Sequence, residues 1–418
     1  MESQNNRCLY VAFHYPPILG SSGVHRTLAF TRHLAENDWD VDVLTGSLKA
    51  YDRWEASQLS FIPEKVNVIR AFGRNTAKHL SIKGKYLGLM ALPDNWQSWI
   101  FGGVISGLFS TLRNRPDILV STYPIASAHI IAYVLHKLSG IPWVADLRDP
   151  MAQEGYPSNP RKKRIFQWLE RKMVKHCHHI ILTTPGAKAL YVERFPETSD
   201  DKWKIVPNGY DIAMFESLQT TSNRQQSEKI ILLHSGVVYP SERDPKPLFH
   251  AISALKKSGQ LTVSNFELRL RATGHDAIYQ PLLAEMNIED IVKLEAPVPF
   301  HDALKEMIMV DGLLLMQAAN CDYQIPAKAY EYIRVGKPIF ALTTEQGDTG
   351  QLMAKQPNSV IAPLDDASTI EHQLMNYLKQ LRNGELAPLP EEEILRYSRQ
   401  YHASSFEACL QHSIRNSI

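Results

Sequence analysis

Two series of short apolar runs, separated from one another by helix-like stretches, constrain the fold of this chain more than any other feature. The runs are rich in Val, Ile and Leu, as expected of strands that are buried on both faces of a sheet. Between the first two runs, from Val24 to Glu36, apolar residues recur at the 3.6-residue spacing of a helix. This alternation predicts an α/β fold with parallel, doubly wound sheets. The predicted strands are 7–13, 40–45, 66–70, 117–122, 142–147 and 179–184, followed by 229–236, 266–273, 291–295, 311–317, 338–343 and 359–363.

The chain divides between the two series. Its 418 residues exceed what one compact core usually covers. The stretch 212–228 is polar and has no apolar period, so it is predicted to link an N-terminal domain, 1–211, to a C-terminal domain, 229–388. The segment 389–418 is predicted to be helical, and it can pack back on the N-terminal domain.

The amino-acid composition limits which partners and which cellular compartment are expected. Basic and acidic residues nearly balance, with a formal net charge of +1, so global charge gives no argument for binding nucleic acid. The four cysteines lie far apart without a CxxC pattern, which indicates neither a disulfide framework nor a zinc site and fits a reducing compartment. The N-terminus lacks the pattern of a signal peptide, and no apolar run reaches the length of a membrane span. A cytoplasmic protein is expected, with any membrane contact made from the surface.

Ligands in open α/β sheets bind beyond the carboxyl ends of the strands, so the loops there are the candidate sites. The first such loop, 14–26, contains Gly20 and Gly23 just before the predicted helix. Glycine allows close backbone approach, and a helix start offers free N–H groups to an anion. GxGxxG is absent, so no NAD fingerprint is present. The alternative is an ordinary strand-to-helix turn.

A second loop, PWVADLRDP at 142–150, places Asp146, Arg148 and Asp149 at the end of a predicted strand. The functional interpretation is that an acidic and a basic group face the ligand. The alternative is an Arg–Asp pair that pins the loop.

The third loop, 234–248, continues from Gly236 to Arg243 and Lys246 before a helix. Arginine suits bidentate contact with phosphate, and lysine acts as a point charge. The alternative is solvated surface charge.

The fourth segment, 325–342, is predicted to be a helix opened by Pro326 and ended by Gly336. The backbone N–H groups of Ala327 and Lys328 would then face an anion. A carboxylate at Glu331 could accept two hydrogen bonds from a ribose diol. The alternative is a glutamate that complements the helix dipole.

Two other clusters have simpler interpretations. His176, His178 and His179 lie beside a predicted strand start and lack a metal-binding pattern, so they are interpreted as structural. The segment Arg161 to Lys175 is a basic helix with interleaved apolar residues, a pattern that can contact an anionic membrane. The alternative is a domain helix that buries its apolar face.

Taken together, these loops resemble those of the large retaining glycosyltransferase family four over nearly the whole chain. The family's NG-D-F passage is matched in the segment KIVPNGYDIAMF by Asn208, Gly209, Asp211 and Phe215. Glu331 is similar to the family's ribose-binding glutamate. Three positions depart from the pattern: Tyr323 replaces an upstream glutamate, Val237 replaces an arginine, and Arg148 replaces a histidine.

The resemblance implies the GT-B fold, with two Rossmann-like domains facing across a cleft. It implies transfer of a sugar, with retention, from a nucleoside diphosphate sugar to a hydroxyl of a saccharide or lipid-linked acceptor, typically in bacterial surface-polysaccharide biosynthesis. Arg243, Lys246 and the helix start at Ala327 would neutralise the diphosphate without a metal or other cofactor. Arg148 and Asp149 would face acceptor or donor hydroxyls. Two alternatives stay open: a non-catalytic nucleotide-sugar-binding scaffold and a nucleotide-sugar 2-epimerase.

Overall fold

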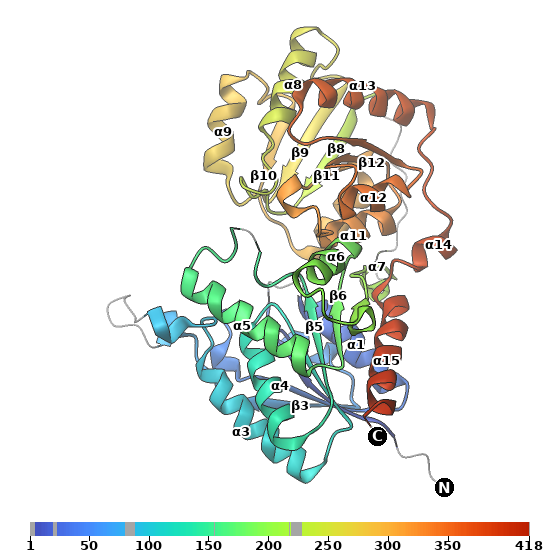
Figure 1. Ribbon diagram of the computed structural model, residues 1–418. Helices are drawn as coiled ribbons and strands as arrows, with labels where there is room; N and C mark the ends of the chain where they lie inside the picture. The colour runs from blue at the N-terminus through green and yellow to red at the C-terminus, as the bar shows by residue number, and fades with distance from the viewer. Residues whose placement is uncertain are drawn as a thin grey trace. The chain divides into compact units, whose positions relative to one another are not determined.

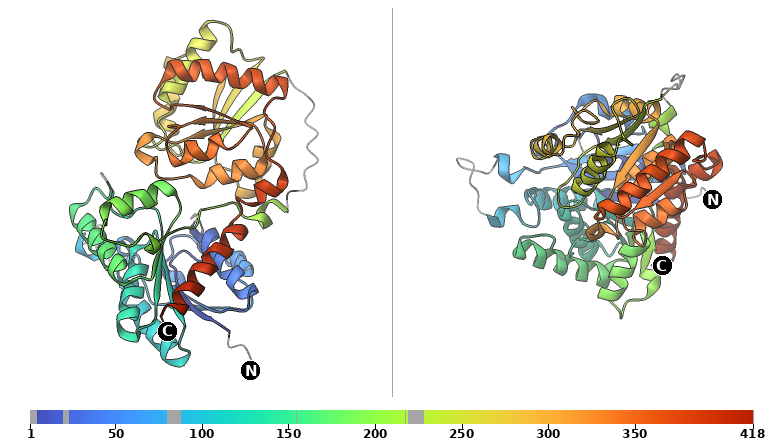
Figure 2. Two further views of the ribbon diagram at one scale, coloured as in Figure 1. Left: turned by 45° about the vertical axis from the view of Figure 1, so that its right-hand side comes forward. Right: turned by 90° about the horizontal axis from the view of Figure 1, so that it is seen from above.

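The computed structural model of the protein describes residues 5–19, 23–79, 88–153, 155–216, 218 and 228–417. Its contacts divide the chain into two compact units (Figures 1 and 2). Unit 1 comprises residues 1–207 and 399–418, and unit 2 comprises residues 208–398. Part of the segment predicted to be a linker, Ile212–Glu216, is a short helix of unit 2, since Phe215 there is buried against that unit's core.

Unit 1 is built on a seven-stranded parallel sheet in the order β3-β2-β1-β4-β5-β6-β7. The six strands predicted for this half are confirmed to within a few residues. The seventh, β7, has three residues and is too short for any periodicity to reveal it. The strands are β1 Arg7–Val11, β2 Asp40–Gly46, β3 Val66–Ala71, β4 Ile118–Thr122, β5 Trp143–Arg148, β6 His179–Leu182 and β7 Trp203–Ile205.

Helices cover both faces of this sheet. Successive strand side chains point to opposite faces, so Leu9 and Val11 lie in the core under α3 to α6, while Cys8 and Tyr10 lie in the core under α1 and α15. The last helix, α15, packs against α1 in unit 1 (Figure 2). The helices are α1 Gly23–Glu36, α2 Thr76–His79, α3 Ser98–Arg113, α4 Ala126–Ser139, α5 Pro160–His176, α6 Pro185–Arg194 and α15 Arg399–Arg415.

Unit 2 repeats the plan with a six-stranded parallel sheet in the order β10-β9-β8-β11-β12-β13. All six predicted strands are confirmed. Along β8, Ile230 and Leu232 lie in one core and Ile231 and Leu233 in the other, so both faces are buried. The strands are β8 Ile230–Ser235, β9 Phe266–Arg271, β10 Val292–Glu295, β11 Gly312–Met316, β12 Ile339–Leu342 and β13 Ser359–Ala362.

The predicted architecture of two doubly wound Rossmann-like domains is therefore confirmed. None of the described helices is long and apolar enough to cross a membrane. The helices of unit 2 are α7 Ile212–Glu216, α8 Lys246–Lys257, α9 Asp276–Glu285, α10 Phe300–Met309, α11 Ala327–Val335, α12 Asp348–Ala354, α13 Ala367–Asn383 and α14 Glu391–Leu395.

Candidate functional site

The first candidate site lies in unit 2 where the strand order reverses, between β8 and β11. From β8 the chain continues to β9 on one side, and from β11 it continues to β12 on the other. Loops that diverge in this way leave a crevice at the carboxyl edge of the sheet, where ligands of doubly wound proteins bind. The loop after β8 carries Gly236 and Arg243, and the segment after β11 leads to α11.

Lys328, in the first turn of α11, reaches back to the end of β8. Its ammonium lies so close to Gly236 that a Cβ atom at this glycine would collide with it. Gly236 also has φ of +127°, a conformation that other residues rarely adopt. Burial lowers the pKa of Lys328, Glu331 raises it and Arg243 lowers it further. Gly236 thus provides the space that holds a partly desolvated cation at the switch point.

Arg243 is the second cation of this site. Its guanidinium donates a hydrogen bond to the carbonyl of Val237 at 3.2 Å and lies 3.5 Å from the side-chain oxygen of Gln317, which follows β11. It also stacks over Tyr239, 5.6 Å from the ring centroid. These contacts hold the side chain near Lys328 although the charges are alike. We call Arg243 and Lys328 the basic pair.

The helix α11 has the predicted boundaries. Pro326 is its N-cap, and Gly336 ends it in the left-handed conformation with φ of +72°. The N–H groups of the first turn, including those of Ala327 and Lys328, therefore lie at the same end as the Lys328 ammonium, and both attract an anion. Glu331 follows one turn later and interacts electrostatically with Lys328.

Lys246 is another cation predicted for the diphosphate site, and it forms an ion pair with a nearby aspartate. It begins α8 and pairs with Asp244 at 3.8 Å, and both side chains are about half exposed. This pairing is compatible with the alternative of solvated surface charge, and the role of Lys246 in donor binding stays a prediction. Lys328, which is also predicted for this site, lies close enough to Arg243 to interact with it electrostatically.

His234, which the sequence did not single out, is fully buried at the end of β8. Its Nδ1 lies 2.9 Å from the carbonyl oxygen of Leu314, and its Nε2 has no hydrogen-bond partner within the part of the chain that the structure describes. Burial, as the larger cause, and the positive charge of the nearby Lys328 lower the pKa of His234 to about 3. A neutral imidazole therefore lies beside the basic pair.

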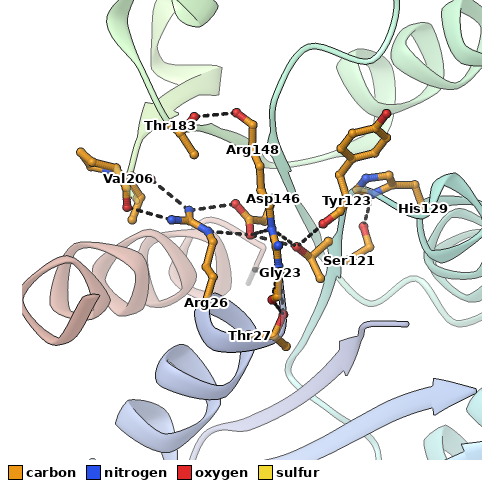
Figure 3. A network of polar contacts seen from close by, with 12 residues as sticks. Gly23, Arg26, Thr27, Ser121, Tyr123, His129, Asp146, Arg148, Thr183 and Val206 are labelled. Atoms are coloured by element: carbon orange, nitrogen blue, oxygen red, sulfur yellow. Dashed lines mark hydrogen bonds and ion pairs between the residues drawn. The ribbon is translucent and has the colours of Figure 1, made fainter. Parts of the chain in front are cut away.

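The second candidate site is a buried polar network at the carboxyl edge of the sheet in unit 1 (Figure 3). Asp146, on β5, accepts hydrogen bonds of 3.1 and 3.0 Å from Arg26, which projects from α1. Arg26 also donates to the carbonyl groups of Val206 and Pro207. Burial alone would raise the pKa of Asp146, but Arg26 and Arg148 outweigh that effect and lower it.

Arg148 joins this network from the last position of β5. It donates to Thr122 at 3.0 Å, to the Thr27 hydroxyl at 2.9 Å and to the Gly23 carbonyl at 3.2 Å (Figure 3). Its backbone is left-handed, with φ of +61°, and Thr183 donates to its carbonyl at 2.8 Å. Such strain in a non-glycine residue persists only where the surroundings enforce it. The Nη1 group forms no hydrogen bond with a described residue.

Asp149 follows directly and is only half buried. Burial raises its pKa, while Arg148 and Arg26 lower it. Among the described residues, none donates a hydrogen bond to its carboxylate. The roles predicted for Arg148 and Asp149 stay predictions, but the structure places a conformationally fixed guanidinium next to a carboxyl group that has no hydrogen-bond donor among them.

Of the predicted glycine loop, Gly20 lies outside the described residues. Gly23 begins α1, and its carbonyl contributes to the network around Arg148. In the sequence Arg26 is only a basic residue of a predicted helix. Its ion pair with Asp146 could not be predicted, because the two residues are 120 positions apart.

Comparisons with known proteins agree with this architecture. Residues 22–209 match the family model described as "Glycosyl transferase 4-like domain". No curated protein matches the chain significantly. Sucrose-phosphate synthase from Thermosynechococcus elongatus has a similar structure, with a TM-score of 0.68 and 13% identity, over 99% of this chain and 100% of its own.

Two similar structures contain nucleotide sugars. HepE of Anabaena, in complex with UDP-glucose, has a TM-score of 0.61 and 12% identity over 98% of both chains. The UDP-GlcNAc 2-epimerase of Neisseria meningitidis, bound to UDP-GlcNAc, has a TM-score of 0.55 and 13% identity over 97% of this chain and 100% of its own. At these identities the likeness concerns the fold alone.

Proposed function

We propose, from the match of residues 22–209 to the glycosyl transferase 4-like family model and from the GT-B architecture of the chain, that the protein transfers a sugar from a nucleoside diphosphate sugar to an acceptor hydroxyl. The predicted resemblance to glycosyltransferase family four is confirmed for these residues. The observation that carries the proposal is the basic pair at the switch point of unit 2. The nucleotide sugars bound to two proteins of similar fold support the choice of donor.

The proposed chemistry depends on charge at the leaving group. Transfer breaks the bond between the sugar and the diphosphate, so negative charge develops on the diphosphate and must be stabilised. Arg243 and Lys328 supply two positive charges there, and the first-turn N–H groups of α11 add hydrogen-bond donors. Two fixed cations make a metal unnecessary for this task in the proposed mechanism. Glu331 would accept hydrogen bonds from the ribose.

In unit 1, we assign Asp149 and the Nη1 group of Arg148 to a hydroxyl of the acceptor or the donor. The shared contacts of Arg26 and Arg148 with Asp146 position that guanidinium. Retention at the anomeric carbon is part of the proposal and rests on the family resemblance. If the ionised carboxylate of Asp149 accelerates transfer, activity falls as the pH drops through its raised pKa, and the residual activity of Asp149→Asn should lack that acid limb in the pH profile.

We further propose a lipid-linked saccharide acceptor, used in polysaccharide or glycolipid biosynthesis at the cytoplasmic face of a membrane. The basic helix α5 turns Phe166, Leu169 and Met173 into the core, while Trp168 and most of its cations lie toward solvent.

Helix α3 supplies the apolar surface instead. Phe101, Ile105, Phe109 and Leu112 follow one face of that helix and are 71%, 56%, 71% and 83% exposed. Since α4 packs against both α3 and α5, these three helices form one layer on the sheet (Figure 1). This combination fits an anionic bilayer. Binding to vesicles of anionic but not zwitterionic lipid, weakened in a Phe101→Ser/Phe109→Ser variant, tests the assignment.

The test of the donor assignment is a panel of UDP-, GDP-, ADP- and dTDP-sugars. The cognate nucleotide should raise the melting temperature, since a ligand that binds the folded state stabilises it. Arg243→Ala should abolish transfer, whereas Arg396→Ala, an exposed arginine of the same unit, should retain it. Full turnover by the Arg243 variant would refute the proposal.

A nucleotide-sugar 2-epimerase remains a second candidate because such an enzyme shares the fold. It would act on the donor alone, so NMR of the sugar without any acceptor separates the two activities. Nucleotide binding without turnover on every acceptor tried would instead favour a scaffold.

A further inference from the structure

Three side chains that can bind a metal meet at the amino-terminal edge of the sheet in unit 1. His179 is the first residue of β6, Asp201 lies in the 3-10 helix Asp200–Lys202, and His412 lies near the end of α15. One ligand atom from each lies within 4.8 Å of the other two. This edge is opposite to the carboxyl edge that carries Arg148.

The hydrogen bonds around His179 fix its tautomer. The Ser413 hydroxyl donates to the carbonyl of Cys409 at 2.9 Å, so its oxygen accepts from Nδ1 of His179 at 2.8 Å. Nδ1 then carries the proton, and Nε2 presents its lone pair to His412 and Asp201. Metal-binding histidines are commonly held in this way, by donation of the other ring N–H.

The spacing of the ligand atoms also fits a metal. Nε2 of His179 lies 3.2 Å from Nδ1 of His412 and 3.6 Å from Oδ2 of Asp201. Metal–nitrogen bonds of about 2.0–2.1 Å in tetrahedral geometry place two ligand atoms roughly 3.3 Å apart. Two of the three separations therefore already match those around a bound ion, and the third, between Asp201 and His412, is within 4.8 Å.

The neighbouring groups leave the necessary atoms available. Lys204 donates a hydrogen bond to Oδ1 of Asp201, whereas it is Oδ2 that faces His179. The amide of Asn416 lies 3.1 Å from Nε2 of His412, and an amide can present either its oxygen or its nitrogen. With the oxygen turned inward, the amide accepts a hydrogen bond from Nε2–H and leaves the lone pair of Nδ1 of His412 to the metal.

We propose that His179, Asp201 and His412 bind a divalent ion of the zinc type, with water as the fourth ligand. Two imidazoles and a carboxylate suit Zn²⁺. The ion joins α15 to β6 and to the segment before β7, so it fastens the C-terminal helix to unit 1. It is a structural ion, and the proposal is independent of the proposed sugar transfer.

The test uses untagged full-length protein freed of metal with a chelator. Zn²⁺ should bind with one site per chain that is absent or at least tenfold weaker in His412→Ala and Asp201→Asn. The same titration of His372→Ala, an exposed helical histidine of unit 2, should match wild type. Co²⁺ in place of Zn²⁺ should give the strong visible absorption of a tetrahedral site in wild type only.

Thermal unfolding provides a second measurement. Zn²⁺ should raise the melting temperature of wild type and His372→Ala, but not that of His412→Ala. Equal zinc affinity in wild type and in the His412 and Asp201 variants would overturn the proposal, and so would a wild-type melting temperature that zinc leaves unchanged.

Discussion

Replacing Lys328 with methionine separates the binding of the donor from the stability of the fold. The side chain keeps most of its length and loses its charge. A hydrogen bond that involves a charged group contributes about 1.5–3 kcal/mol. At about 1.4 kcal/mol for each factor of ten, nucleoside diphosphate binding should weaken roughly 10- to 150-fold.

The same substitution should leave the unliganded protein as stable as wild type, or make it more stable. Burial and Arg243 lower the pKa of Lys328 in the folded state. A lysine whose folded pKa lies below its unfolded value destabilises the fold while it is charged, and this cost falls as the pH rises from the folded pKa and is fully lost above the unfolded pKa. Methionine removes the cost at neutral pH.

The assay is isothermal titration with the nucleoside diphosphate that the thermal screen selects, followed by thermal unfolding without ligand. Lys246→Met is the matched control, because that lysine is exposed and pairs with Asp244 on the surface. Its affinity should change less than threefold. Wild-type affinity in Lys328→Met, or a larger loss in Lys246→Met, would refute the assignment of the basic pair.

Three further substitutions test other parts of the sites. Arg26→Leu leaves the buried carboxylate of Asp146 without its main partner and should lower the free energy of unfolding of unit 1 by about 3–5 kcal/mol in urea unfolding. Arg32→Leu on the same helix should cost under about 1 kcal/mol. Equal losses in the two variants would contradict the stabilising role of the Arg26–Asp146 pair. Gly236→Ala should lower the free energy of unfolding by about 1–3 kcal/mol, because an alanine would have to adopt the positive φ of this position. The new methyl group should also displace Lys328 and weaken nucleotide binding. An unchanged affinity would show that Lys328 does not need this space. Glu331→Gln should weaken the affinity for a nucleoside diphosphate but not for pyrophosphate, which lacks a ribose; a parallel loss of both in titrations would argue against the ribose contact.

The sequence by itself determined the architecture. Strands buried on both faces must consist of apolar runs, and the helices between them must carry a 3.6-residue period, so both patterns are local. The boundaries of α11 were also local, because a proline can open a helix and Gly336 adopts the left-handed conformation that ends it. Short elements such as β7 carried too few residues to show a pattern.

Only the tertiary structure decided which charged groups share a site. Lys246 and Lys328 are both cations near predicted strand ends, and the difference between them depends on the space that Gly236 leaves beside α11. Arg26 finds Asp146 across 120 residues, and His179 meets His412 across 233. Side-chain chemistry fixes what each group can bind, but the sheet order and the return of α15 to unit 1 determine which groups come within bonding distance.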